Sequence, residues 1–154
     1  MNISEYKIRF IEHKIENSYL HACNLDINCI KPGNVNIHTS HIDTTSEDFI
    51  TSYTVTSKII ASPKMSLGER IENSIIATKN NVTTNTNLGI ILLCSLFSQS
   101  LCLKKDITLT EAIRDIILNC KKQDISKICN AITIANPGGL GTHEKFDVRS
   151  DIKI

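Results

Sequence analysis

The sequence contains no tryptophan, and only 5% of its residues are aromatic. Proteins that bind single-stranded nucleic acid without sequence preference stack bases on aromatic side chains, so this composition disfavours that class. An excess of one charge is missing as well: 17 basic and 16 acidic residues give the 154-residue chain a formal charge of +1. General nucleic-acid and membrane-surface binders need a basic face. We therefore expect neither a nucleic acid nor a membrane as partner.

Long hydrophobic runs are also lacking. The longest apolar stretch, residues 88–103, is interrupted by three serines and a glutamine. A membrane span needs about 20 apolar residues, so this stretch predicts a buried helix instead. The N-terminus has an acidic residue at Glu5 and no long apolar region, which is not typical of a signal peptide. These features predict a cytoplasmic protein.

Six cysteines are present, but no Cys-x-x-Cys pair occurs among them. Most of them fall at apolar positions of helix-like segments. We interpret them as buried, reduced thiols, as expected in the cytoplasm.

Apolar spacing and Ser/Thr-x-x-Asp/Glu capping patterns predict an all-α fold. No segment alternates as a half-buried strand would, and residues 51–56, although rich in β-branched side chains, fit a helix better. We expect one domain over residues 1–154, with 136–154 as a polar loop and tail. The six expected helices run from 3 to about 27, 44 or 45 to about 61, 66 to about 80, about 87 to 103, 108 through 117, and 124 to 135.

Glycine and proline are scarce, with six and three residues. Five glycines and two prolines fall in three polar patches, residues 31–35, 85–89 and 136–141. Glycine permits backbone angles and close approaches that a side chain forbids. This distribution predicts a ligand site formed by loops between helices.

The first patch offers a cation on a constrained backbone. The ammonium of Lys31 precedes Pro-Gly and suits a phosphate, and Asn34 adds an amide; the alternative is a Pro-Gly turn with a solvated lysine. Downstream, His38, His41 and Asp43 have a spacing typical of metal ligands, but no fourth ligand is obvious. Asp43 alone is the better candidate, as a partner of phosphate-bound Mg²⁺ or as a helix-start residue.

The other two patches also allow two interpretations. Asn85, Thr86 and Asn87 precede an apolar helix, whose first N–H groups favour anions and whose neighbouring side chains suit a ribose or phosphate. The alternative is an ordinary N-cap. Residues 136–141 lack the Lys-Ser/Thr ending of a P-loop. They form either part of the site or a helix C-cap with a flexible tail.

The order of the patches resembles the triphosphoribosyl-dephospho-CoA synthase family, from about Ala22 to the end of the chain. The resemblance is closest to the branch seen in archaea and methylotrophs. The segments that carry it are Leu25-Asp26, Lys31-Pro32-Gly33-Asn34-Val35, Asp43 to Phe49, Thr84 to Ile90, Ala135 to Gly141 and Asp147-Val148-Arg149. The resemblance implies an all-helical enzyme, a pentosyl transferase. Such an enzyme transfers the triphosphoribosyl group of ATP to the 2′-hydroxyl of dephospho-CoA and releases adenine.

The same resemblance implies roles for individual residues and a cofactor, Mg²⁺, bound with ATP. It implies that the catalytic carboxylates are Asp26, Asp43 and Asp147, and that Asp43 also binds the metal. Contacts to substrate or phosphate fall to Lys31, Gly33, Asn34, Asn85, Thr86, Asn87, Gly89, Asn136, Gly138 and Gly139.

Two departures from the family pattern are visible. Asp26 stands where the family usually has glutamate, and family members are nearly twice as long as this chain. We expect an N-terminal portion of the family domain, with an apolar face covered by self-association or by a partner chain. Two alternatives stay open: a related nucleotide-dependent transferase in one-carbon (methanopterin-type) cofactor assembly, and a helical subunit that binds nucleotide without turnover.

Overall fold

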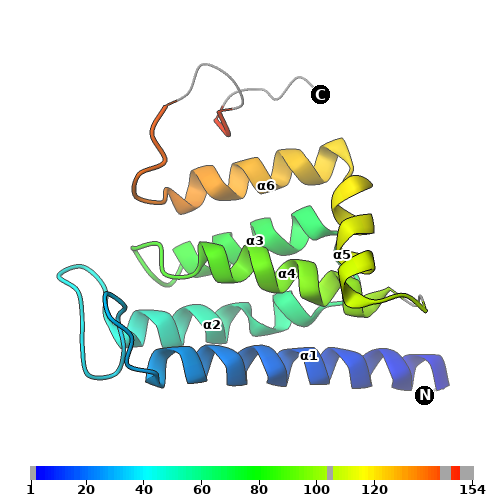
Figure 1. Ribbon diagram of the computed structural model, residues 1–154, viewed down its shortest axis with the longest axis horizontal. Coiled ribbons are helices and arrows are strands. Elements are labelled where there is room, and N and C mark those ends of the chain that lie inside the picture. Colours follow the sequence, from blue (N-terminus) through cyan, green and yellow to red (C-terminus); the bar gives the residue numbers. More distant parts are fainter. Residues whose placement is uncertain (1–2, 104–105, 143–146, 150–154) are drawn as a thin grey trace.

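Six helices make up the part of the chain described by the computed structural model, residues 3–103, 106–142 and 147–149 (Figure 1). The all-α prediction is confirmed, and these residues contain only two isolated β-bridges and no strand. None of the described helices is long and apolar enough to cross a membrane. The helices are α1 (Ile3–Asn28), α2 (Ser46–Ala61), α3 (Leu67–Lys79), α4 (Leu88–Cys102), α5 (Leu109–Leu118) and α6 (Lys122–Ala135).

Capping boxes open three of the helices where the sequence predicts them. In each box a hydroxyl accepts from the N3 backbone N–H, and the N3 carboxylate accepts from the N-cap backbone. Two orphan donors are thereby satisfied at each helix start. The pairs are Thr45 with Asp48, Ser66 with Glu69, and Thr108 with Glu111.

The start of α6 differs from its prediction. The helix begins at Lys122 rather than at Asp124, and its N-cap residue Lys121 makes no side-chain hydrogen bond. Asp124 is used elsewhere: its Oδ1 accepts from Ser66 Oγ at 2.5 Å and from Gly68 N at 2.9 Å. Its carboxylate therefore caps α3 across the α3–α6 contact instead of starting its own helix.

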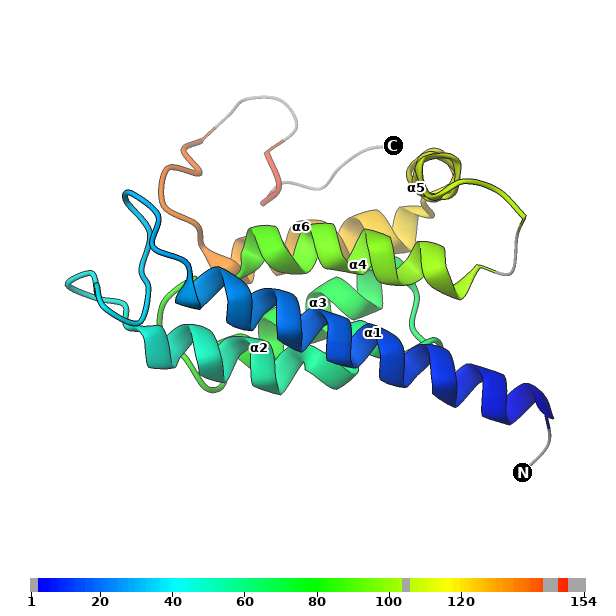
Figure 2. The ribbon, with the colours of Figure 1, turned by 60° about the horizontal axis from the view of Figure 1, so that its bottom comes forward.

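The helices pack around a shared core. α1 lies on α2, α2 on α3, and α3 between α4 and α6, while α5 packs on α4. α1 and α6 form opposite sides of the bundle (Figure 1), and the N-terminal end of α1 extends beyond the other helices (Figure 2). Core residues on α1 recur every fourth position, at Ile15, Tyr19 and Cys23.

Two sequence expectations need correction. None of the six cysteines forms a disulfide, but only Cys23 is buried, and Cys29 is exposed because it follows the last residue of α1. Helix α4 is buried on one side only: Leu93 and Leu101 are 55% and 57% exposed, and Leu101 lines a groove between α4 and α1.

Candidate functional site

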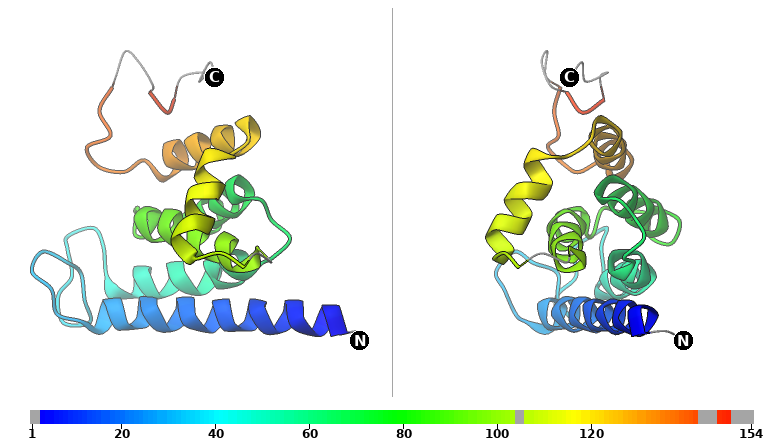
Figure 3. Two further views of the ribbon diagram at one scale, coloured as in Figure 1. Left: turned by 45° about the vertical axis from the view of Figure 1, so that its right-hand side comes forward. Right: turned by 90° about the vertical axis from the view of Figure 1, so that its right-hand side faces the viewer.

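The three glycine-containing patches lie at the same end of the bundle. The loops at residues 29–45 and 80–87 and the segment after α6 all leave the helices on the left of Figure 1, and the left view of Figure 3 agrees. The C-terminal ends of α1, α3 and α6 and the N-terminal ends of α2 and α4 meet there. Chain direction alone therefore places the loops together, since successive helices run up and down the bundle.

A cavity of about 470 Å³ opens at this end, between the last turn of α1 and the first turns of α2 and α4. This volume is within the range of small-molecule sites. Its wall combines hydrogen-bonding groups with an apolar side. The lining residues are Asp26, Gly33, Asn34, Val35, His41, Thr44, Phe49, Asn85 and Ile90.

The turn at residues 31–34 forms one edge of the cavity. Asn34 N donates to Lys31 O at 3.2 Å, and Gly33 adopts a φ of 79°, which a side chain would strain. A Cβ built on Gly33 would meet no atom within 4 Å, so this backbone faces open space. The Lys31 ammonium forms an ion pair with the carboxylate of Asp26. The turn thus holds a charged pair beside an accessible backbone.

A second cavity of about 310 Å³ lies behind the same turn. It shares Gly33, Asn34 and His41 with the first cavity and adds Lys31. These shared residues form the wall between the two spaces. Asp26 therefore lines the main cavity and Lys31 the second one, on opposite sides of the partition that the shared residues form.

His41 belongs to this partition although the sequence reading gave it only a metal role. Its Nε2 lies 3.2 Å from the carbonyl oxygen of Gly33. A carbonyl only accepts, so Nε2 carries the hydrogen in either charge state of the ring. Among the described residues, no group of three or more His, Cys, Asp or Glu side chains could hold a metal ion. His38, His41 and Asp43 therefore do not form a metal cluster.

The second patch sends its side chains in different directions. Asn85 lines the main cavity, and its Oδ1 accepts from Leu88 N at 3.2 Å. Thr86 is buried and its Oγ1 lies 2.5 Å from the hydroxyl of Ser52 on α2. Of these two predicted site residues, only Asn85 reaches the cavity wall.

Asn87 is also turned inward. Its side chain is almost fully buried, and its Nδ2 donates to Thr78 Oγ1 on α3 at 2.9 Å. Its Oδ1 has no hydrogen-bond partner. Asn87 is the N-cap residue of α4 but forms no side-chain cap, and Gly89 in the first turn has open space at its Cβ position. The first turn of α4 thus lacks the carboxylate that caps α2, α3 and α5.

The third patch ends α6 but does not line the cavity. Asn136 takes a left-handed conformation (φ 46°), and its N–H donates to Ile132 O at 3.1 Å, an ordinary C-cap. Gly138 and Gly139 are exposed, with no neighbouring atom near their Cβ positions. The structure brings this patch to the same end of the bundle without bringing it into the cavity wall.

Two of the three predicted catalytic carboxylates lie outside the wall. Asp43 is exposed in the loop before α2 and is not among the lining residues. Asp147 is paired with Arg149 at 2.9 Å, and Arg149 also donates to Gly141 O. Their short segment (red in Figure 1) lies beside α6, at a distance from the 29–45 loop. Asp26 is thus the only predicted catalytic carboxylate that borders the main cavity.

Thr44, Phe49 and Ile90 complete the wall and were missed as site residues. Phe49 lies one turn after the Thr45 cap, and Ile90 is the third residue of α4, so the helix register could have placed both at the cavity mouth. Thr44 Oγ1 lies 3.5 Å from Thr84 Oγ1 and joins the α2 and α4 loops.

Comparisons with known proteins agree with this arrangement of loops and motifs. The family model described as CitG: ATP:dephospho-CoA triphosphoribosyl transferase matches residues 12–154. Neither the curated proteins nor the solved structures gave a match to the chain. The matched range includes all three patches and every helix except the first turns of α1. The chain therefore belongs to the ATP:dephospho-CoA triphosphoribosyl transferase (CitG) family, whose reaction transfers the triphosphoribosyl group from ATP to dephospho-CoA.

Proposed function

We propose that this chain binds ATP in the main cavity, with the triphosphate beside the 31–34 turn and the first turn of α4. The observation that carries the proposal is the start of α4 at the cavity wall, where neither the N-cap residue Asn87 nor a carboxylate caps the helix. Capping boxes with a carboxylate open α2, α3 and α5, whereas α4 has only the neutral Asn85 bond to Leu88 N. Helix N-termini attract anions through their free N–H groups and their dipole.

Lys31 and Gly33 supply the opposite side of this phosphate site. The Gly33 backbone faces open space, so a phosphate can approach it closely. Lys31 lines the second cavity, but its ammonium is paired with Asp26 of the main cavity wall, where it would balance part of the triphosphate charge. Phe49, Val35 and Ile90 provide an apolar wall for the base.

In the transfer, the 2′-hydroxyl oxygen of dephospho-CoA bonds to C1′ of the ATP ribose. The bond from C1′ to the adenine nitrogen breaks, and adenine leaves with that electron pair and takes up a proton, which balances the proton lost by the attacking hydroxyl. Positive charge builds on the sugar as this bond breaks, and the carboxylate of Asp26 is placed to stabilise it. A carboxylate is also the group that accepts the proton of the attacking hydroxyl. Asp43 and Asp147 remain candidates for that proton.

Magnesium fits this site as a companion of the triphosphate. Mg²⁺ usually binds one or two carboxylates together with substrate phosphates, and keeps several waters. No cluster of three ligands exists in the described part of the chain, so Asp26 and Asp43 are the carboxylates that would hold it. Bound there, the ion would neutralise phosphate charge.

We also propose that the chain belongs to the archaeal and methylotroph branch, because its Lys-Pro-Gly-Asn-Val and Asp-Thr-Thr segments resemble that branch most closely.

The test combines ATP binding with an assay for free adenine. Wild-type protein given ATP, Mg²⁺ and dephospho-CoA should release adenine and form a heavier CoA product. Lys31→Met should weaken ATP binding at least tenfold, because it removes the lysine ammonium beside the partition. Lys64→Met is the matched control, since Lys64 is exposed in the loop between α2 and α3. Unchanged ATP affinity in Lys31→Met would remove the phosphate role of this lysine.

A further inference from the structure

Helix α4 carries large apolar side chains on its exposed face as well as on its buried one. Its buried positions are Leu88, Ile91 and three serines, whereas Leu93, Phe97 and Leu101 are 55%, 36% and 57% exposed. These three large side chains follow one another every fourth residue and so share one face. Leaving part of such side chains in water forgoes hydrophobic stabilisation that full burial would supply. This face of α4 therefore has the composition of a binding surface.

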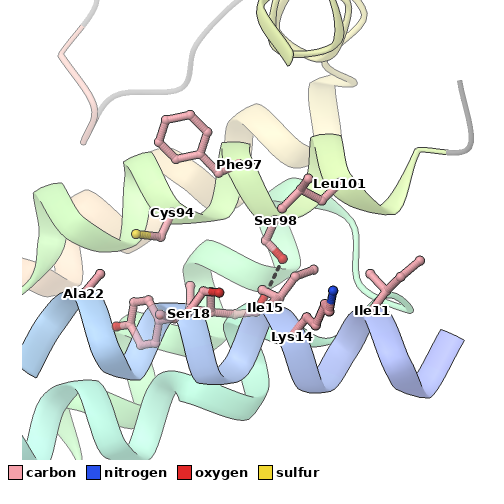
Figure 4. Close-up of a pocket in the computed structure, with 11 residues that line it drawn as sticks. Ile11, Lys14, Ile15, Ser18, Ala22, Cys94, Phe97, Ser98 and Leu101 are labelled. Atoms are coloured by element: carbon pink, nitrogen blue, oxygen red, sulfur yellow. Dashed lines mark hydrogen bonds between the residues drawn. The ribbon is translucent and has the colours of Figure 1, made fainter. Parts of the chain in front are cut away.

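A groove of about 430 Å³ runs between α1 and the part of this face formed by Phe97 and Leu101. Its α1 wall includes Ile11, Ile15, Ser18 and Ala22, and its α4 wall includes Cys94 and Leu101. Figure 4 shows these side chains facing one another across the space, with Ala22 and Cys94 at one end and Ile11 and Leu101 at the other. The remaining lining residues are Lys14, Tyr19, Ile60, Phe97 and Ser98.

The groove and the candidate site are neighbours along the same two helices. Asp26 and Ile90 line the main cavity, and Ala22 and Cys94 line the groove. Each pair is separated by four residues on the same helix, which is about one turn, or roughly 6 Å. A ligand held in the cavity can thus reach the groove by following α1 and α4 for one turn.

We infer that the groove binds the pantetheine arm of dephospho-CoA, an inference that rests on the proposed function of the cavity. The arm is a chain of about twelve atoms, equivalent to roughly four extended residues, or about 14 Å. From Ala22 to Ile11, α1 rises about 16 Å. The arm therefore matches the groove in length when the ribose and diphosphate of dephospho-CoA occupy the cavity end.

The chemistry of the two surfaces also matches. The arm carries two methyl groups and several methylenes, which suit the faces of Ile11, Ile15 and Leu101. Its amides and hydroxyl require a few polar neighbours, and Ser18 and Lys14 supply them on the exposed rim of α1. No carboxylate is among the residues that line the groove itself, so its wall suits an uncharged arm.

A leucine at position 22 tests the inference because it would narrow the groove at its end near the cavity. Ala22 is exposed on a helix, so Ala22→Leu should fold, and an unchanged melting temperature checks this. His21→Leu is the control, since His21 is the exposed neighbour outside the groove. Calorimetry should show dephospho-CoA binding weakened at least tenfold in Ala22→Leu and unchanged in His21→Leu, with ATP affinity equal in all three proteins. Pantetheine alone should bind the wild type and lose affinity in Ala22→Leu.

Several results would overturn the assignment. The first is that Ala22→Leu leaves the affinity for dephospho-CoA unchanged. The second is that Ala22→Leu weakens ATP and dephospho-CoA binding equally. A third is a wild-type dimer, measured by light scattering, that Ala22→Leu splits while dephospho-CoA binding stays intact; the groove would then be an interface between two copies. Failure of the proposed function looks different: wild-type protein would bind dephospho-CoA in the groove and release no adenine.

Discussion

A methyl group added at Gly68 should destabilise the protein, although glycine is a poor helix residue. Gly68 is the second residue of α3 and faces the start of α6. A Cβ built on it would lie 2.6 Å from Asp124 Cα and 2.7 Å from Asp124 O. Both neighbours are backbone atoms, so a rotamer change cannot relieve the clash. The two helices would have to separate.

The size of the effect follows from two losses. Overpacking at a tight contact costs about 1–3 kcal/mol. Separation also lengthens the 2.9 Å bond from Gly68 N to the Asp124 carboxylate, and hydrogen bonds to charged groups contribute about 1.5–3 kcal/mol. Alanine is intrinsically more favourable than glycine in a helix, and this preference offsets up to about 1 kcal/mol of the loss. We expect Gly68→Ala to lower the free energy of unfolding by about 3 kcal/mol.

Gly89→Ala provides a matched control at the second residue of α4, where a Cβ would meet nothing within 4 Å. Thermal and urea unfolding, followed by circular dichroism, would measure both variants. Gly68→Ala should melt about 6–12 °C below the wild type, since 1 kcal/mol shifts a domain of this size by roughly 2–4 °C. Gly89→Ala should match or slightly exceed the wild type. Equal melting temperatures for the two variants would refute the argued α3–α6 contact.

Two further predictions concern charged groups. Arg70 is fully buried, and its guanidinium donates to the carbonyls of Ile59 and Ile60. It has no carboxylate partner among the described residues. Arg70→Met would leave those carbonyls unpaired, so urea unfolding should show a loss of about 3 kcal/mol in the free energy of unfolding. Hydrogen bonds from Ser66 and Thr108 lower the pKa of Glu69 and Glu111 from the usual range of a glutamate. Their stabilisation is fully present above the pKa of an unfolded glutamate and is lost as pH falls through the lowered values, so a double Glu→Gln variant should show a smaller stability loss in acid than the wild type.

Local signals made most of the helix boundaries predictable. The Thr45–Asp48, Ser66–Glu69 and Thr108–Glu111 boxes lie within four residues of sequence, and each opens a helix as predicted. The start of α6 was wrong because Asp124 bonds to residues more than fifty positions away. A capping residue that serves another helix carries no local mark in the sequence.

The candidate site shows the same limit. Asp26, Gly33 and Asn85 could be placed near one another because their patches follow one another at helix ends. The inward turn of Asn87 could not be predicted, because its direction depends on Thr78 of α3. His41 could not be assigned either, since its neighbour Gly33 is set by the fold of the whole 33–44 loop.

Helix α4 links the candidate site and the groove through one feature of its sequence. Its fifteen residues carry no charge, and the sequence predicted a buried helix. In the structure Leu88, Ile91 and the small serines face inward, where the Ser98 hydroxyl donates to Ile60 O at 2.5 Å, whereas Phe97 and Leu101 line the groove. Phe97 and Leu101 are only partly buried in the described bundle, so the rest of their burial depends on what occupies the groove. Because the first turn of α4 borders the cavity without a carboxylate cap, the same helix would orient the phosphates of one substrate and the flexible arm of the other.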